Sequence, residues 1–237
     1  LILVDEAHHA PAKTWQGLLD HFTDAKKILF TATPFRRDKK EVPGKLVYNY
    51  PLSKAKEDNV FGEIGYLPVT PAGDETADIA LAKAAERVLN EDREAGLRHF
   101  LLIRTERRDH AKELKRIYEE HTALNVRKID SSQTFNYIQS TIKALREGRL
   151  DGIICVNMLG EGFDFPNLKI AAIHAPHKSL AITLQFIGRF ARTNANDIGT
   201  AKFLASPNDI VLGKQQLYQE GAIWDEMIVN LSEERID

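Results

Sequence analysis

Two acidic residues stand side by side where the chain leaves its first apolar run. Asp5 and Glu6 directly follow residues 1–4, a run that is typical of a buried strand. At a strand end, one carboxylate can hold Mg²⁺, and the other can orient and deprotonate a water that attacks a phosphoanhydride. Taken alone, the pair also fits a solvated strand end or a helix cap.

Hydroxyl side chains follow the next apolar run. Thr31, Ala32, Thr33 and Pro34 lie at the end of a strand predicted at 28–31. Small hydroxyl groups there can hydrogen-bond across to the two carboxylates and relay a change in the state of a bound phosphate. The alternative is a plain turn, because Pro34 is a strong breaker.

A glycine-rich segment, 160–166, comes after the strand predicted at 152–156. Gly160 and Gly162 let the backbone approach a phosphate or a ribose closely, and Asp164 could accept a hydrogen bond from a ribose hydroxyl. The alternative interpretation is a glycine-rich connection between two elements of an α/β fold.

Two arginines share a helical face in the segment 185–192. Offsets of four and three residues place Gln185, Arg189 and Arg192 on that face. Gly188 in the middle costs about 1 kcal/mol of helix propensity, which indicates close packing or close approach of a ligand. Two guanidinium groups on one face suit stabilisation of charge on a transferring phosphoryl group. A solvated basic face is the alternative.

The composition is that of an ordinary globular protein. The 237 residues are 43% hydrophobic and 28% charged, with a net charge of −2, so any anion binding must be local. The apolar runs are too short to span a membrane, which predicts no membrane partner. Cys155 is the single cysteine and lies in an apolar run, which predicts a buried thiol in a reducing, cytoplasmic compartment.

Short apolar runs alternate with helical patterns along the chain, which predicts an α/β fold with parallel sheets. Strands are expected at 1–4, 28–31, 46–50, 99–104, 125–129, 152–156, 169–174 and 201–205. Helices are expected at 14–22, 76–95, 108–120, 135–147 and 180–190. The pattern predicts a first domain at 1–70, a breaker-rich linker at 71–75, a second domain at 76–205 and a helical tail at 206–237.

The order and spacing of these clusters resemble the motifs of superfamily-two helicases. Asp5-Glu6-Ala7-His8 is similar to motif II of the DEAH type, and residues 31–33 to motif III. Residues 104–106 resemble motif IV, 156–166 motif V, and 185–192 the Gln-x-x-Gly-Arg-x-x-Arg of motif VI. The strings 31–36 and 161–166 are most similar to the branch that holds restriction-enzyme translocases and excision-repair helicases.

The resemblance implies two RecA-like doubly wound domains with ATP bound between them. Asp5 would serve Mg²⁺, Glu6 the attacking water, and Arg189 and Arg192 would act as arginine fingers. The nucleotide-binding residues implied are Gly162, Asp164 and Gly188. The residues implied to couple nucleotide state to domain closure are His8, Thr31, Thr33 and Gln185.

The resemblance also implies a nucleic-acid partner, with DNA favoured over RNA by the branch. The candidate grips on the strand are Arg36, Arg37, Arg104 and Arg107, each of which could equally be a solvated surface charge. Motif V often opens with Thr, whereas Val156 stands here, so the usual hydroxyl contact to the nucleic-acid backbone is in doubt at this position.

No Gly-x-x-x-x-Gly-Lys followed by Ser or Thr occurs in the sequence, and the chain opens within a predicted strand without Met. Both features lead us to expect a piece of a longer helicase, with its first domain truncated, that is inactive alone. Two alternatives stay open: a non-catalytic nucleic-acid-binding or regulatory module, and a phosphoryl-transfer enzyme that binds no nucleic acid.

Overall fold

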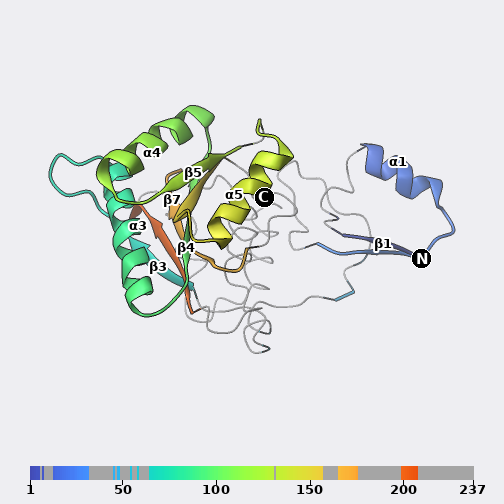
Figure 1. The fold of residues 1–237 in the computed structure, drawn as a ribbon. Helices are drawn as coiled ribbons and strands as arrows, with labels where there is room; N and C mark the ends of the chain where they lie inside the picture. The colour runs from blue at the N-terminus through green and yellow to red at the C-terminus, as the bar shows by residue number, and fades with distance from the viewer. Residues whose placement is uncertain are drawn as a thin grey trace, which may run out of the picture. The chain divides into compact units, whose positions relative to one another are not determined.

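In a computed structural model, the chain divides into two compact units, Leu1–Tyr50 and Pro51–Asp237. The structure describes residues 1–5, 7, 13–31, 45, 47, 48, 54, 58, 64–130, 132–156, 165–175 and 199–207. Each unit carries its own parallel sheet, as the ribbon in Figure 1 shows.

The first unit is built on a parallel pair of strands joined by a helical crossover. Its described elements are β1 (Ile2–Val4), α1 (Lys13–His21) and β2 (Lys27–Leu29). Val4 lies opposite Leu29 in the pairing register. The described core of this unit consists of Val4, Ala7 and Leu19. A helix between the strands is expected, because parallel neighbours cannot be joined by a tight hairpin.

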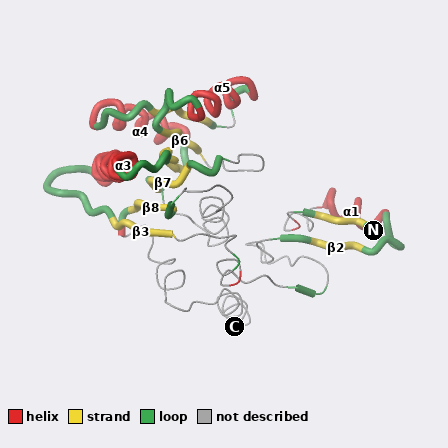
Figure 2. The backbone as a smooth tube through the Cα atoms, turned by 60° about the horizontal axis from the view of Figure 1, so that its bottom comes forward, coloured by secondary structure: helices red, strands yellow, loops and turns green. Residues whose placement is uncertain are grey.

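The second unit contains a six-stranded sheet in which every described strand pair is parallel. Its strands are β3 (Ile64–Pro68), β4 (Phe100–Thr105), β5 (Val126–Ile129), β6 (Gly152–Val156), β7 (Leu168–Ile173) and β8 (Ala201–Ala205). They lie in the order β3-β8-β7-β4-β6-β5, which Figure 2 shows as a stack from β3 through β8 and β7 to β6. This order places β4 between β6 and β7.

Helices cover both faces of this sheet. They are α3 (Ala77–Glu94), α4 (Arg108–His121) and α5 (Phe135–Arg146). The first two share one core cluster, and α5 packs into the other cluster through Ala144 and Leu145. The connections that contain α3 and α4 run toward the β5 edge, and the one that contains α5 runs back. Right-handed crossovers therefore put α5 on the opposite face. No helix in the described ranges is long and apolar enough to cross a membrane.

The strand β4 lies at the centre of the second unit, and all six of its residues are buried. Its neighbour β6 approaches it very closely at Gly152. A Cβ atom built on Gly152 would lie 2.5 Å from the carbonyl oxygen of Leu101 and 2.8 Å from its Cβ. Glycine is therefore required at this position, because any larger residue would collide with the β4 backbone.

Matching signals at both ends bound α3 and α5. Thr76 and Thr134 cap the two helices by accepting a hydrogen bond from the amide three residues on. Gly96 and Gly148 follow the C-caps with φ of 80° and 71°. The next amide after each glycine bonds back to the carbonyl five residues earlier, which is the Schellman arrangement.

The predicted α/β class and parallel architecture are confirmed. The helices predicted at 76–95, 108–120 and 135–147 agree with α3, α4 and α5 within one residue at each end. The strands predicted from 99 to 205 agree equally well. The strand predicted at 28–31 is shifted, because β2 ends at Leu29.

The predicted domain boundary at 71–75 is too late. The strand β3, which ends at Pro68, pairs with β8 and so belongs to the second sheet, and the two units divide after Tyr50. Pro68 favoured a linker in the sequence because proline interrupts most strands. An edge strand tolerates it, because one side of the strand has no partner to which an amide must donate.

The strand predicted at 46–50 is wrong at its two described positions, because Val47 and Tyr48 lie outside any strand and are exposed. The described residues do not include positions 46, 49 and 50, the helix predicted at 180–190 or the tail from 208 on.

Candidate functional site at the carboxyl edges of the sheets

Asp5 and Thr31 lie at the same edge of the first sheet, the carboxyl edge. The backbone pairing continues past the strands: the Phe30 amide donates to the Val4 carbonyl, and the Ala7 amide donates to the Phe30 carbonyl, both at 2.8 Å. Asp5 is exposed within this segment, and Thr31 is partly buried next to Phe30. The structure therefore brings Asp5 and the start of 31–34 to one edge.

An exposed carboxylate of this kind fits Mg²⁺ that arrives with a nucleotide. Protein Mg²⁺ sites commonly use one or two carboxylates together with substrate phosphates and water, rather than a cage of protein ligands. Asp5 supplies such an oxygen donor at a strand end. Among the described residues, no group of three or more His, Cys, Asp or Glu side chains could hold a metal ion by itself.

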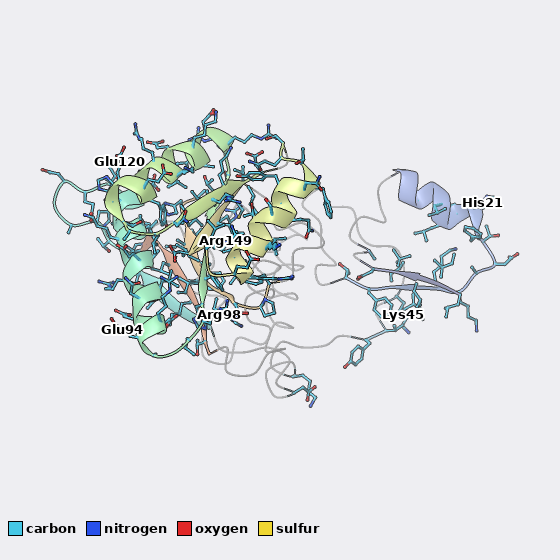
Figure 3. The ribbon with its side chains drawn as sticks, in the orientation of Figure 1. His21, Lys45, Glu94, Arg98, Glu120 and Arg149 are labelled. Atoms are coloured by element: carbon cyan, nitrogen blue, oxygen red, sulfur yellow. The ribbon has the colours of Figure 1, made fainter. Side chains whose placement is uncertain are left out.

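The carboxyl edge of the second sheet gathers three segments around the end of β4. Thr105 is the register partner of Val156, the last residue of β6, and Arg104 is the partner of Ile173 at the end of β7. The chain enters β6 and β7 on opposite sides of β4, and ligands of open α/β sheets bind at such a switch point. Arg98 and Arg149, labelled in Figure 3, precede β4 and β6 and so mark the opposite, amino edge.

Two of the residues predicted to contact nucleic acid, Arg104 and Arg107, are described, and their surroundings differ. Arg104 is only 6% exposed, and its Nη1 donates to the Ala175 carbonyl at 3.1 Å. The amide of His174 donates in return to the Arg104 carbonyl at 2.9 Å. Burial lowers the pKa of this guanidinium. Arg107 is exposed at the start of α4. Arg104 thus ties β4 to the end of β7, in contrast to the surface grip predicted for it.

A largely buried polar network joins the ends of β4 and β7 to α3 and α4. Nδ1 of His174 lies 2.7 Å from one carboxylate oxygen of Asp78, and Nε2 of His110 lies 2.9 Å from the other. The remaining ring nitrogens contact hydroxyl groups. His174 Nε2 is 3.1 Å from Tyr118 Oη, and His110 Nδ1 is 2.8 Å from Thr105 Oγ1.

The carboxylate of Asp78 fixes the direction of the two hydrogen bonds that it receives. A carboxylate only accepts, so each histidine donates to Asp78 through the ring nitrogen that faces it. Burial raises the pKa of Asp78, but the hydrogen bonds from His174 and His110 outweigh it, so this pKa lies below its ordinary value of 3.8. Burial also raises the pKa of Tyr118 well above 10, which keeps its proton available for donation.

The sequence analysis missed Asp78, His110, Tyr118 and His174. Only His174 carried a recognisable signal, since it directly follows a buried strand as the other clusters do. The partners come from positions 78, 105, 110, 118 and 174, so no local spacing reveals them.

A second buried carboxylate organises the end of β5. Asp130 is 1% exposed and accepts from Lys128 Nζ at 2.8 Å and from the Ser132 amide at 2.9 Å. Arg108, at the start of α4, lies 3.8 Å from the same carboxylate. Hydrogen bonds from Lys128 first and then from Ser132 hold the pKa of Asp130 below its ordinary value. The carboxylate fixes the start of α4 relative to the loop before α5.

Most of the predicted site residues fall outside the described part of the chain. They are Glu6, His8, Thr33, Arg36, Arg37, Gly162, Asp164, Gln185, Gly188, Arg189 and Arg192. Their roles stay predictions.

Both units match known protein families. Residues 83–194 match the helicase conserved C-terminal domain, and residues 1–36 match the type III restriction enzyme, res subunit. Each match lies within one of the two units.

The chain is also similar to curated proteins. It is 26% identical over 220 residues to a Saccharomyces cerevisiae protein with the assigned name ATP-dependent helicase IRC3, covering 81% of this chain and 32% of that protein. It is 24% identical over 226 residues to a protein with the assigned name helicase 22 from Sulfolobus islandicus filamentous virus, covering 83% and 40%. The chain thus spans less than half the length of these relatives.

Among solved structures, S. cerevisiae Dbp5 bound to RNA and ADP BeF3 matches with a TM-score of 0.58 and 19% identity. The L327V form of the same protein gives the same TM-score with 16% identity. Each match covers 98% of this chain and 62% of the other. At this level of identity the likeness shows a shared fold.

Proposed function

Because this chain belongs to the superfamily-two helicases, we propose that it is the ATP-hydrolysing part of a DNA helicase or translocase. The observation that carries the proposal is the family match in both units, to residues 1–36 and 83–194. The name of the yeast relative describes ATP dependence, and the Dbp5 structure contains RNA, which supports a nucleic-acid partner. DNA is favoured by the resemblance of 31–36 and 161–166 to the restriction and excision-repair branch.

In this proposal, the acidic pair and the two arginines of 185–192 act on ATP. Bound Mg²⁺ would neutralise charge on the phosphate oxygens. Asp5 would hold the cation, and Glu6 would orient the attacking water and accept its proton. Arg189 and Arg192 donate to the γ-phosphate oxygens as negative charge develops there.

The other predicted residues support this chemistry. Gly162 and Gly188 allow close approach of the backbone to the nucleotide, and Asp164 accepts a hydrogen bond from a ribose hydroxyl. The residues proposed to transmit the nucleotide state are His8, Thr31, Thr33 and Gln185. Arg36, Arg37 and Arg107 bind the phosphates of the nucleic-acid strand. Arg104 is buried, and its role in this proposal is to hold Ala175, the second residue after β7, in place.

The test measures turnover and nucleic-acid affinity in a protein that carries this chain together with a phosphate-binding loop. Arg189→Ala and Arg192→Ala should each lower turnover by roughly 10³-fold, which is about 4 kcal/mol of transition-state stabilisation. Lysine at either position should rescue poorly, because a point charge lacks the bidentate fork. Near-normal turnover with lost nucleic-acid binding would make these arginines strand contacts and would favour the non-catalytic alternative.

A further inference from the structure

The first two turns of α5 project from the second unit with little packing. Phe135 is 72% exposed and Tyr137 is 36% exposed, and Asn136, Gln139 and Ser140 are exposed between and after them. The buried residues of α5 all lie in its second half, at Thr141, Ala144 and Leu145. In the described part of the second unit, Phe135 and Tyr137 are the only exposed large hydrophobic side chains.

The ring of Tyr137 is held in place by contacts on its own unit. Its hydroxyl donates to the Lys128 carbonyl at 3.3 Å, and the guanidinium carbon of Arg127 lies 5.8 Å from the ring centroid. Arg127 is itself positioned by a 3.4 Å hydrogen bond to Thr141 Oγ1. An aromatic ring fixed beside a cation is preorganised to stack with another flat π-system.

The charge around these rings complements a polyanion. The sequence of α5 contains no acidic residue, and the cation beside the rings is Arg127. The basic residues of α5 itself, Lys143 and Arg146, lie in its last turn, where Lys143 pairs with Glu147. The nearby carboxylate of Asp130 is 1% exposed and is already paired with Lys128. A nucleic-acid strand would therefore meet the Arg127 guanidinium and the side-chain amides of Asn136 and Gln139 at this surface, with no exposed carboxylate in the first two turns of α5 to repel its phosphates.

The placement of the rings favours separate flat ligands over a continuous apolar partner. Residues two apart on a helix do not face each other, so Phe135 and Tyr137 cannot form one apolar stripe. Polar side chains separate them, which a hydrophobic protein interface would have to desolvate. Successive bases of a single strand can each use one ring, because every base has a π-face.

We propose that the first two turns of α5 bind single-stranded nucleic acid by stacking bases on Phe135 and Tyr137, with Arg127 and the exposed amides beside them. This inference rests on the proposed function for its nucleic-acid partner and adds base stacking to a grip expected mainly through phosphates. Stacking of this kind tolerates any sequence, as a translocating protein requires.

The experiment compares two labelled probes on the 237-residue chain by fluorescence anisotropy. One is a short oligothymidylate, and the other is an abasic strand of the same length that keeps the phosphates and lacks the bases. Phe135→Ala and Tyr137→Ala should each weaken binding of the oligothymidylate by roughly 5- to 150-fold, the range measured for base–aromatic stacking. Binding of the abasic strand should be unchanged.

Conservative variants separate stacking from other causes. Tyr137→Phe keeps the ring and should bind almost as wild type, whereas Phe135→Leu keeps apolar volume without a π-face and should bind as weakly as Phe135→Ala. Tyr48→Ala is the matched control, because Tyr48 is 72% exposed in the first unit. Circular dichroism should show that every variant keeps its helix content.

Three outcomes would overturn the inference. Unchanged oligothymidylate binding by both alanine variants would remove the stacking role, and an equal loss on both probes would assign the surface to phosphates. Wild-type affinity in Phe135→Leu, with loss in Phe135→Ala, would identify an apolar contact instead. If the wild-type chain bound neither probe, the nucleic-acid part of the proposed function would fail with it.

Discussion

Replacing Asp78 with alanine should destabilise the second unit more than any surface carboxylate does. The Asp78 carboxylate is the shared acceptor for His174 and His110. The His174 side chain is fully buried. In the alanine variant its Nδ1–H would lose the Asp78 acceptor, and water could not take the place of that acceptor. The His110 side chain is 17% exposed and can reach water in part.

The expected cost follows from these contacts. A buried donor left unsatisfied costs about 1–3 kcal/mol. The favourable position of Asp78 in the first turn of α3 adds about 0.3–1 kcal/mol. The sum for Asp78→Ala is about 1.3–4 kcal/mol in the free energy of unfolding, measured by urea titration followed by circular dichroism.

Asp109→Ala is the matched control. Asp109 also lies in the first turn of its helix, α4, but its side chain is 96% exposed and pairs with Lys112 at 3.3 Å. Its loss should cost no more than about 1 kcal/mol. Equal costs for Asp78→Ala and Asp109→Ala would refute the reasoning, because they would reduce the network to a helix-dipole effect.

Three further predictions concern single groups. Gly152→Ala should lower the free energy of unfolding by about 1–3 kcal/mol or more, because the new Cβ would collide with the Leu101 backbone. Gly17→Ala, with open space around Gly17, should be neutral or stabilising in the same urea titration. Burial raises the pKa of Cys155 to about 12, so a thiol reagent should label it only on unfolding, and rapid labelling of the native chain at neutral pH would contradict its burial. The pKa of Asp130 is lowered, so its stabilising effect is complete above about 3.8 and is lost as pH falls below it; Asp130→Asn should flatten this acid limb of the stability–pH curve.

Local signals in the sequence predict the elements of the second unit well. Thr76 and Thr134 are the N-caps of α3 and α5, and a glycine, Gly96 or Gly148, follows the C-cap of each helix. The bounds of both helices therefore follow from the sequence alone. The continuous apolar runs of β4 and β6 predict strands that are buried on both faces.

The errors come from information that is not local. Pro68 reads as a breaker, and only the position of β3 at the edge of the sheet explains its place in a strand. Arg104 reads as a basic residue at a strand end, and its burial depends on the Ala175 carbonyl, 71 residues away. The polar network depends in the same way on the contact of Asp78 with His174, 96 residues away.

The central claim is that this chain is part of an ATPase that nucleic acid stimulates. The most direct test is the steady-state rate of ATP hydrolysis as single-stranded DNA or RNA is titrated into a protein that carries this chain and a phosphate-binding loop. The account predicts saturable stimulation that Glu6→Gln abolishes while the affinity for the strand stays near wild type. A rate that does not respond to any nucleic acid, or that Glu6→Gln leaves intact, would contradict it.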